Sequence, residues 1–258
     1  MELWTKEHFL QLIPSVAVML IIALILNKLI GKKPLKIRMI PFQIVAVILL
    51  LSEVGKQVIS FSRGYDLYHI PLHVCSLFLL LLPAMAFYQG KDMDKVRTIA
   101  CSVCVSLLLF MTIYPNIIYS AGNIKNFFAN YFDFHTVFFH TGVIFELILI
   151  IVLRLHSVDP EKSYFKPMLV FSAGYSLIAA TMAQLLKTNF SNFYSCNIGP
   201  IEAFVNSIKE AIGYAGAQAI YVSILFVLHV LFFLGSHYLY RAIDKLNVKL
   251  RKKAFAEA

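Results

Sequence analysis

Residues 9–30, FLQLIPSVAVMLIIALILNKLI, form a nearly unbroken apolar run, and runs of this kind decide the fold class of the chain. A helix of about 20 residues spans the roughly 30 Å hydrocarbon core of a bilayer. The 258-residue chain contains several such runs, and it is 59% hydrophobic and 14% charged. Soluble domains are about half apolar and about a quarter charged. The sequence therefore predicts a protein that crosses a membrane several times.

The apolar runs predict helices rather than the strands of a barrel, because they are continuous and do not alternate between apolar and polar residues. We expect an all-α transmembrane bundle of about seven spans that forms one integral membrane domain over residues 1–258. The predicted spans are about 9–30, 39–60, 71–89, 96–115, 135–155, 165–187 and 212–240. The first residues, MELWTKEHF, lack the basic start of a signal peptide, so we expect the first span to be retained.

The distribution of positive charge predicts how the bundle is oriented. The connections after the first, third and fifth spans and the C-terminal tail hold 17 of the 23 Lys and Arg residues. Cytoplasmic loops carry the excess of Lys and Arg, so this distribution places the N-terminus outside and the C-terminus in the cytoplasm. The net charge of +9 is explained by this topology, and we expect no binding of nucleic acid.

The most unusual polar residues open the third span, YHIPLHVCSLFLLLLP at residues 68–83. We place Pro71 in the first turn of that helix, where its missing N–H is no loss. His73 and Cys75 then lie roughly 3 Å and roughly 6 Å inside the outer end of the span. The same counting puts polar groups from five spans near one level in the outer third of the bilayer. The residues near this level are Glu53, Lys56, His69, His73, Cys75, Asn116, His135, His140 and Gln184.

Polar residues at one depth predict one shared pocket, because an ionisable side chain within a span is expensive and indicates function by default. The inner halves of the second to fourth spans are almost purely apolar. The structural alternative is that Glu53 and Lys56 pair on one helix face and that the histidines bond backbone carbonyls. Glu146, in mid-span, is expected to face the bundle interior, either as a hydrogen-bonded carboxyl or with a role of its own.

The combination of a thiol and imidazoles suggests acyl chemistry by one of two routes. In the first, Cys75 is a nucleophile, and His140 is its base because His73 and Cys75, two apart on a helix, point away from each other. In the second, His73 and His140 act as general base and acid while a substrate hydroxyl or amine attacks an ester. Lys56, Asn116 or loop amides would then stabilise the oxyanion.

Metal and redox chemistry are disfavoured by the spacing of the histidines and cysteines. His69 and His73 have i, i+4 spacing, but Pro71 lies between them and places His69 outside the helix, and no HExxH signature is present. We predict no metal and no cofactor. The CxxC of Cys101 and Cys104 lies inside a span and is interpreted as packing. Cys196, in the loop before the last span, is a possible disulfide partner for Cys75.

Several short motifs resemble a known family. IPLHVCSL resembles the LPLHLC signature of the YwaF-like family of bacterial integral membrane proteins, FFHTGVI its SHG helix, and NFSNFYSCNIGP its Asn- and Tyr-rich loop. SEVGKQ is similar to a Glu–Gly–Lys segment of an animal relative, transmembrane protein 164. The resemblance covers roughly residues 40 to 235. It implies a multi-pass protein of the bacterial plasma membrane.

The resemblance also implies an activity. The animal relative is described as a phospholipid acyltransferase. The resemblance therefore implies acyl chemistry on lipids, with His73 and His140 as the histidines of the site. In that relative the nucleophilic Cys directly precedes the first motif His, whereas Leu72 stands there in this chain. The covalent and the direct routes therefore both stay open.

Three functions follow from these observations. The first is an acyltransferase or ester hydrolase that acts on phospholipid or other acyl esters at the outer leaflet, with membrane lipid as its partner. The second is a transporter or small-solute binding protein without catalysis, although transporters usually place their sites at the bilayer midplane on broken helices. The third is a non-catalytic member of a larger complex. The sequence identifies no soluble partner.

Overall fold

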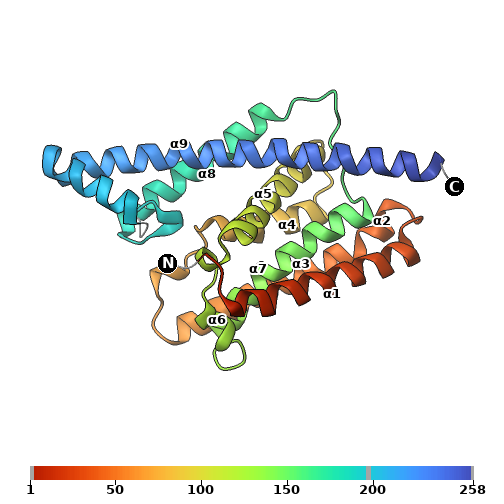
Figure 1. Cartoon of the computed structure of the whole chain (residues 1–258), viewed down its shortest axis with the longest axis horizontal. Helices are drawn as coiled ribbons and strands as arrows, with labels where there is room; N and C mark the ends of the chain where they lie inside the picture. The colour runs from red at the N-terminus through yellow and green to blue at the C-terminus, as the bar shows by residue number, and fades with distance from the viewer. Residues whose placement is uncertain (1–2, 196–198, 257–258) are drawn as a thin grey trace.

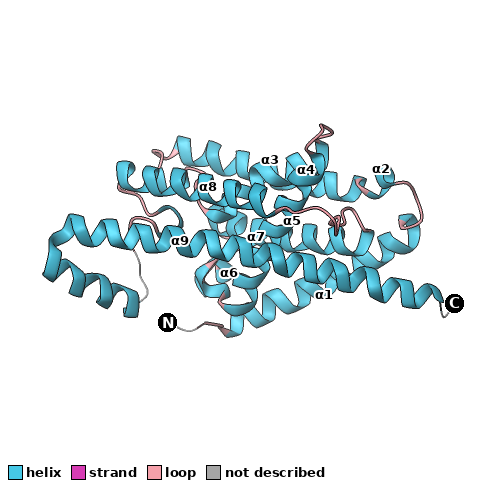
Figure 2. Ribbon diagram, turned by 90° about the horizontal axis from the view of Figure 1, so that it is seen from above, coloured by secondary structure: helices cyan, strands magenta, loops and turns pink. Residues whose placement is uncertain are grey.

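The computed structural model describes residues 3–195 and 199–256, and the regular structure in these ranges is entirely helical (Figure 2). The α-helices there are α1 (Lys6–Ile30), α2 (Leu35–Arg38), α3 (Ile40–Ser62), α4 (Phe78–Phe87), α5 (Met93–Ile113), α6 (Ala121–Lys125), α7 (Tyr131–Leu153), α8 (Phe165–Leu186) and α9 (Gly199–Ala256). Short 3-10 turns are η1 (Leu67–His69), η2 (Val74–Leu77), η3 (Pro115–Ile117) and η4 (Phe190–Asn192). The predicted all-α fold is confirmed.

Six helical stretches among the described residues are long and apolar enough to cross a membrane. They are α1, the α2–α3 stretch Leu35–Ser62, α5, α7, α8 and the Glu202–Lys249 part of α9. The helices pack in two groups, with α1 and α3 against α7, and α5 and α8 against α9. Helix α4 joins the groups by packing between α3 and α5 (Figure 1). The molecule is therefore a polytopic helical bundle, as predicted.

The bundle has two chemically different ends. At the end that we call the histidine end, α3 finishes and α7 begins, and His69 and His135 lie there. At the opposite end, called the basic end, Arg38 Nη1 donates hydrogen bonds to the carbonyls of Leu153 (2.6 Å) and Arg154 (3.0 Å). Arg241 also donates to the carbonyl of Pro160, at 3.3 Å. These contacts gather the basic connections at one end, while the side of the membrane that each end faces stays a prediction.

The third predicted span differs from the expectation that a helix starts at Pro71. The backbone is extended at His73, and a 3-10 turn precedes α4, so the apolar helix is the shorter stretch Val74–Phe87. Irregular backbone at membrane depth is tolerated only where other groups supply its hydrogen bonds. Here Ser191 Oγ accepts from the Val74 N–H at 3.0 Å, and Tyr175 donates to the Leu72 carbonyl at 3.0 Å.

The last helix is longer than the predicted span at 212–240. It is interrupted at Gly213, whose φ of 78° and ψ of 169° are readily adopted only by glycine. Figure 2 shows the segment before Gly213 folding back beside the long segment that follows. Lys209 Nζ lies 5.4 Å from the ring centre of Tyr214 across this break. The long segment then runs along α5 and α8 and continues past the predicted end.

Helices α3 and α7 approach closely because small residues lie between them. A Cβ added at Gly142 of α7 would lie 2.6 Å from Cδ2 of the buried Leu49 of α3. A Cβ at Gly55 of α3 would clash with the Tyr131 hydroxyl, which donates to the Ser52 carbonyl at 2.9 Å. Small residues at such crossings are a common device of membrane helix packing.

We expect Gly142→Val to destabilise the protein by about 1–3 kcal/mol, because the added methyl groups must displace the buried Leu49 side chain or push α3 and α7 apart. The matched control is Gly174→Val in α8, where an added Cβ meets nothing within 4 Å. Thermal unfolding of both variants in detergent measures the difference. Equal melting temperatures for the two variants would contradict the assigned close approach.

Candidate functional site

The carboxylate of Glu53 organises the histidine end. Its Oε1 lies 2.7 Å from Lys56 Nζ and accepts a hydrogen bond from Gln57 Nε2 at 2.6 Å. Its Oε2 lies 2.9 Å from Nε2 of His135, which comes from α7. Glu53 is only 6% exposed, so three partners compensate a carboxylate that is almost removed from solvent. The expected pairing of Glu53 with Lys56 is therefore present, and it is one part of a larger contact between α3 and α7.

His69 is fixed against the last turns of α3. Its Nδ1 lies 2.6 Å from Ser60 Oγ, and its carbonyl accepts from Gln57 Nε2 at 2.8 Å. Its ring stacks on Phe132 with the ring centres 4.8 Å apart. Burial lowers the pKa of the His69 imidazole, which favours the neutral ring. The main role of His69 is therefore structural, because its contacts hold the turn η1 against α3.

His73 presents one nitrogen that is free to act as a base. Its Nε2 lies 3.1 Å from the carbonyl of Tyr68, which can only accept, so Nε2 carries the proton. Nδ1 then holds a lone pair, and no hydrogen bond joins it to a described residue. Burial lowers the pKa of His73, and the positive charge of Lys56 acts in the same direction. The hydrogen bond to the Tyr68 carbonyl raises the pKa, but the net direction is downward, which favours the neutral ring near pH 7.

His140 repeats this arrangement deeper in the bundle. Its Nδ1 lies 2.6 Å from the carbonyl of Thr136, one turn earlier in α7. That carbonyl requires the proton on Nδ1 and leaves Nε2 as the acceptor. The side chain is 6% exposed, and His135, Lys56 and His73 all interact with it electrostatically. His73 and His140 therefore lie near the same lysine, on one side of the bundle.

Cys75 belongs to the same neighbourhood. It lies in the 3-10 turn η2, two residues after the extended His73, so the geometry expected of a regular helix does not apply. Lys56 and Glu53 both interact electrostatically with its sulfur. Cys196 lies outside the described residues, so its disulfide with Cys75 stays a prediction.

Two other predicted residues lie in different surroundings. Asn116 lies in the turn η3, which packs on α5. Gln184 Nε2 donates to the Phe193 carbonyl at 2.7 Å, and Gln184 Oε1 accepts from Gln218 Nε2 at 3.3 Å. Gln184 thus connects α8 with the loop after it and with α9. Gln184 therefore contacts the loop after α8, whereas Lys56 lies near His73 and His140.

Several supporting residues were not predicted. Gln57 bridges Glu53 and His69, and the i, i+4 spacing from Glu53 was a signal for it. Ser191 supports the His73 segment and lies 2.6 Å from the Tyr175 hydroxyl. Ser191 and Asn192 have positive φ angles of 49° and 65°. No local pattern reveals Ser191, because its contacts with residues 72 and 74 join positions 119 and 117 residues apart in the chain.

The expectation that the inner halves of the second to fourth spans are almost purely apolar is wrong for α5. Thr98 Oγ1 lies 2.9 Å from Nε2 of His156, and Ser102 Oγ lies 3.1 Å from Nδ1 of His237. Asp94 contacts this network from the helix start, with Oδ1 3.9 Å from His156 Nδ1 and a hydrogen bond from the Tyr164 hydroxyl. The i, i+4 spacing of Thr98 and Ser102, which places both hydroxyls on one face of α5, could have predicted this cluster. A second polar cluster therefore lies at the basic end.

The remaining candidates lie in the core. Cys101 and Cys104 are buried, and Cys101 Sγ lies 3.9 Å from Met85 Sδ, which agrees with packing. Glu146 faces the interior with 0% exposure, and neither of its oxygens has a hydrogen-bond partner among the described residues. Within residues 3–195 and 199–256, no three His, Cys, Asp or Glu side chains are grouped as metal ligands would be.

We expect His156 to stabilise the fold only while it is neutral. Burial lowers its pKa to about 4, below the ordinary value near 6.5. The stabilisation, up to about 3 kcal/mol, is complete above pH ~6.5 and is lost as the pH falls toward 4. Thermal unfolding of wild type and His156→Gln between pH 7.5 and 4.5 measures this effect. The gap between the two melting temperatures should shrink in acid, and a constant gap would refute the assignment.

Comparison with known proteins places this architecture in a family. The TMEM164 family matches residues 3–236, which include α1 through α8 and the part of α9 from its start to residue 236. No curated protein and no solved structure matches the chain. The match agrees with the resemblance seen in the sequence motifs and with a multi-pass membrane protein. The chain belongs to the TMEM164 family.

Proposed function

We propose that the protein is a lipid-modifying enzyme that transfers or hydrolyses an acyl ester of a membrane lipid at its histidine end. The observation that supports this most is that His73 and His140 each present one unprotonated nitrogen in the neighbourhood of the Lys56 ammonium. Neutral imidazole near a fixed positive charge suits acyl transfer, in which a base removes a proton and an oxyanion develops. The resemblance to a described phospholipid acyltransferase supports the same reaction class.

The proposed reaction needs only groups of the site and the two substrates. Nδ1 of His73 takes the proton of the attacking hydroxyl, which belongs to an acceptor lipid or to water. The hydroxyl oxygen bonds to the ester carbon, and the Lys56 ammonium stabilises the resulting oxyanion. When the tetrahedral intermediate collapses, the bond to the lipid alkoxide breaks and the imidazolium returns its proton to that alkoxide. His140 Nε2 accepts a hydrogen bond from a second donor of the acceptor molecule, which is the other O–H of water or a headgroup N–H or O–H of a lipid, and so orients it.

Glu53 has a supporting role in this scheme. Its carboxylate neutralises Lys56 only in part, because it also contacts His135 and Gln57. The ion pair holds the ammonium in place, and ammonium protons not used by Glu53 are available to the oxyanion. We propose that the histidine end faces the outer leaflet, because the excess of Lys and Arg gathers at the opposite end.

Acyl transfer by the purified protein tests the proposal. Nanodiscs with isotope-labelled phospholipid and unlabelled lysophospholipid are analysed by mass spectrometry. We expect His73→Ala and His140→Ala to lower the rate by roughly 10²–10⁴-fold, because each removes a proton acceptor of the site. Cys75→Ala separates the two chemical routes, since it abolishes turnover only if an acyl–cysteine forms.

His156→Gln and His237→Asn are the matched controls, because these histidines belong to the polar cluster at the basic end. Both controls should retain acyl transfer at a pH near 7. If wild type moves no label between any of the lipids supplied, the proposed activity is wrong. If the controls lose activity as fully as the His73 and His140 variants, the histidine end is not the site.

The pH dependence gives a second test. Lys56 lowers the pKa of His73, so Lys56→Gln should raise that pKa. A base works only when it is unprotonated, so the acid limb of kcat/KM should move to higher pH in Lys56→Gln. Lys125→Gln is the control, because Lys125 pairs with Glu7 at 3.1 Å on an exposed surface. An acid limb that stays in place while the rate falls would exclude His73 as the titrating base.

A further inference from the structure

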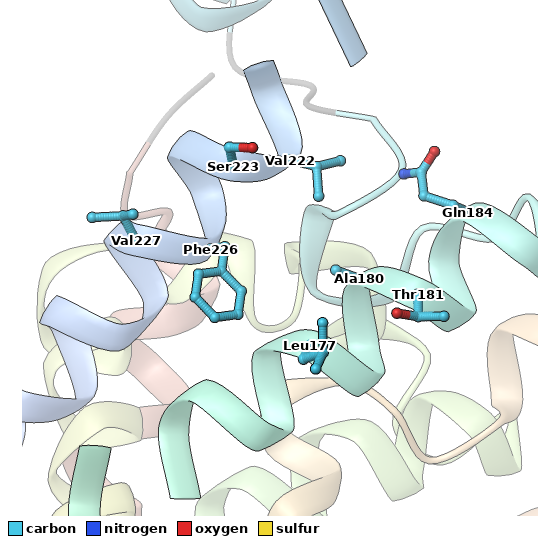
Figure 3. A pocket seen from close by; sticks show the side chains of 8 residues that line it. All are labelled: Leu177, Ala180, Thr181, Gln184, Val222, Ser223, Phe226 and Val227. Atoms are coloured by element: carbon cyan, nitrogen blue, oxygen red, sulfur yellow. The ribbon is translucent and has the colours of Figure 1, made fainter. Parts of the chain in front are cut away.

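A cleft of about 390 Å³ lies between helices α8 and α9 (Figure 3). Leu177 and Ala180 line it from α8, and Val222 and Phe226 line it from α9. Figure 3 shows the Phe226 ring directed toward α8. Most of its lining is therefore aliphatic or aromatic, which suits an apolar ligand.

The cleft opens on a face that is built for contact with lipid. Ile178 is 56% exposed and Leu185 is 70% exposed on α8, and Val227 on α9 is 53% exposed. In a chain that spans a membrane, such side chains face the acyl chains of the bilayer. A groove in this face suits those chains better than water, because water has no polar partners along most of its wall.

The cleft has a polar end and an apolar end. Gln184 lies in the last turn of α8 before Leu186, and Thr181 lies one turn before it. Leu177 is seven residues from Gln184, which corresponds to roughly 10 Å along the helix. A lipid has the same polarity, since its ester group lies near the interface and its chain extends into the hydrocarbon.

The polar end of the cleft connects to the site at the histidine end. The Phe193 carbonyl accepts from Gln184, and the Phe190 ring lies 5.6 Å from the ring of His73. Residues 190–193 therefore contact Gln184, which lines the cleft, at one end and the candidate base His73 at the other. Ser191 holds this loop against the His73 segment, because its hydroxyl accepts a hydrogen bond from the Val74 N–H.

From this continuity we infer that the cleft between α8 and α9 is the binding site for one acyl chain of the lipid substrate. The chain lies between Leu177 and Phe226, and its ester end extends past Gln184 along residues 190–193 toward His73. The substrate class is thus a lipid with a long acyl chain that enters sideways from the bilayer. The role as substrate site rests on the proposed function, whereas occupation of the cleft by a lipid chain does not.

Photocrosslinking tests the inference without any need for turnover. The full-length protein is placed in nanodiscs that contain phosphatidylcholine with a diazirine in the middle of one acyl chain, and labelled peptides are mapped by mass spectrometry. We expect label at residues 177–184 and 222–227, in wild type and in His73→Ala alike. Ala180→Phe narrows the cleft and should lower the label there about tenfold, which corresponds to ~1.4 kcal/mol.

Two further variants keep the test sharp. Ser223→Phe fills the rim of the cleft and serves if Ala180→Phe does not fold, as judged by its melting temperature. Leu185→Phe is the control, because Leu185 faces lipid on the same helix but does not line the cleft. Label that spreads evenly over the lipid-facing helices, with no response to Ala180→Phe or Ser223→Phe, overturns the inference.

The outcomes separate this inference from the proposed activity. Acyl transfer by wild type without label in the cleft leaves the activity in place and overturns the binding site. Label in the cleft without acyl transfer under any lipid tried supports the lipid site and refutes the activity. If both hold, Ala180→Phe should lower kcat/KM for a long-chain ester more than for a short-chain ester, since only the long chain reaches the narrowed part.

Discussion

The hydrogen bonds that Ser191 and Tyr175 make to the backbone before α4 are the contacts on which the candidate site depends. A polypeptide at membrane depth must satisfy each N–H and carbonyl within the protein, and a continuous helix is the usual solution. Residues 70–74 do not form a helix and instead take partners from a distant loop and from α8. This exchange leaves His73 extended, with its ring between Tyr68 and Phe190. A regular helix from Pro71 would place the imidazole differently.

Charge compensation at Glu53 is the second requirement of the site. A buried carboxylate is stable only with partners, and here the partners come from α3 itself and from α7. The same ion pair fixes Lys56 near His73 and His140. The close approach of α3 and α7 at Gly142 makes these contacts possible, because it brings the two helices together along their length. Helix packing and site electrostatics are thus parts of one arrangement.

The two ends of the bundle use similar residue types for different purposes. At the basic end, Thr98 and Ser102 bond the imidazoles of His156 and His237, and these contacts join α5 to the chain after α7 and to α9. At the histidine end, two imidazoles bond a backbone carbonyl through one nitrogen and leave the other available. The cleft between α8 and α9, which we propose holds an acyl chain, meets the histidine end through Gln184 and residues 190–193.

The sequence by itself determined that the chain is an all-α membrane bundle, because apolar runs of sufficient length have few alternatives in lipid. It also identified Glu53, Lys56 and the histidines, because ionisable groups in apolar runs are conspicuous. Only the tertiary structure decided that the third span is broken, that Gln184 belongs to the α8–α9 side, and that a polar cluster occupies the basic end. Each of these depends on contacts between residues far apart in the chain, such as Val74 with Ser191 and Thr98 with His156. The periodicity of apolar residues shows which side of a helix is apolar, but it does not identify the distant residue that forms a hydrogen bond with a polar group.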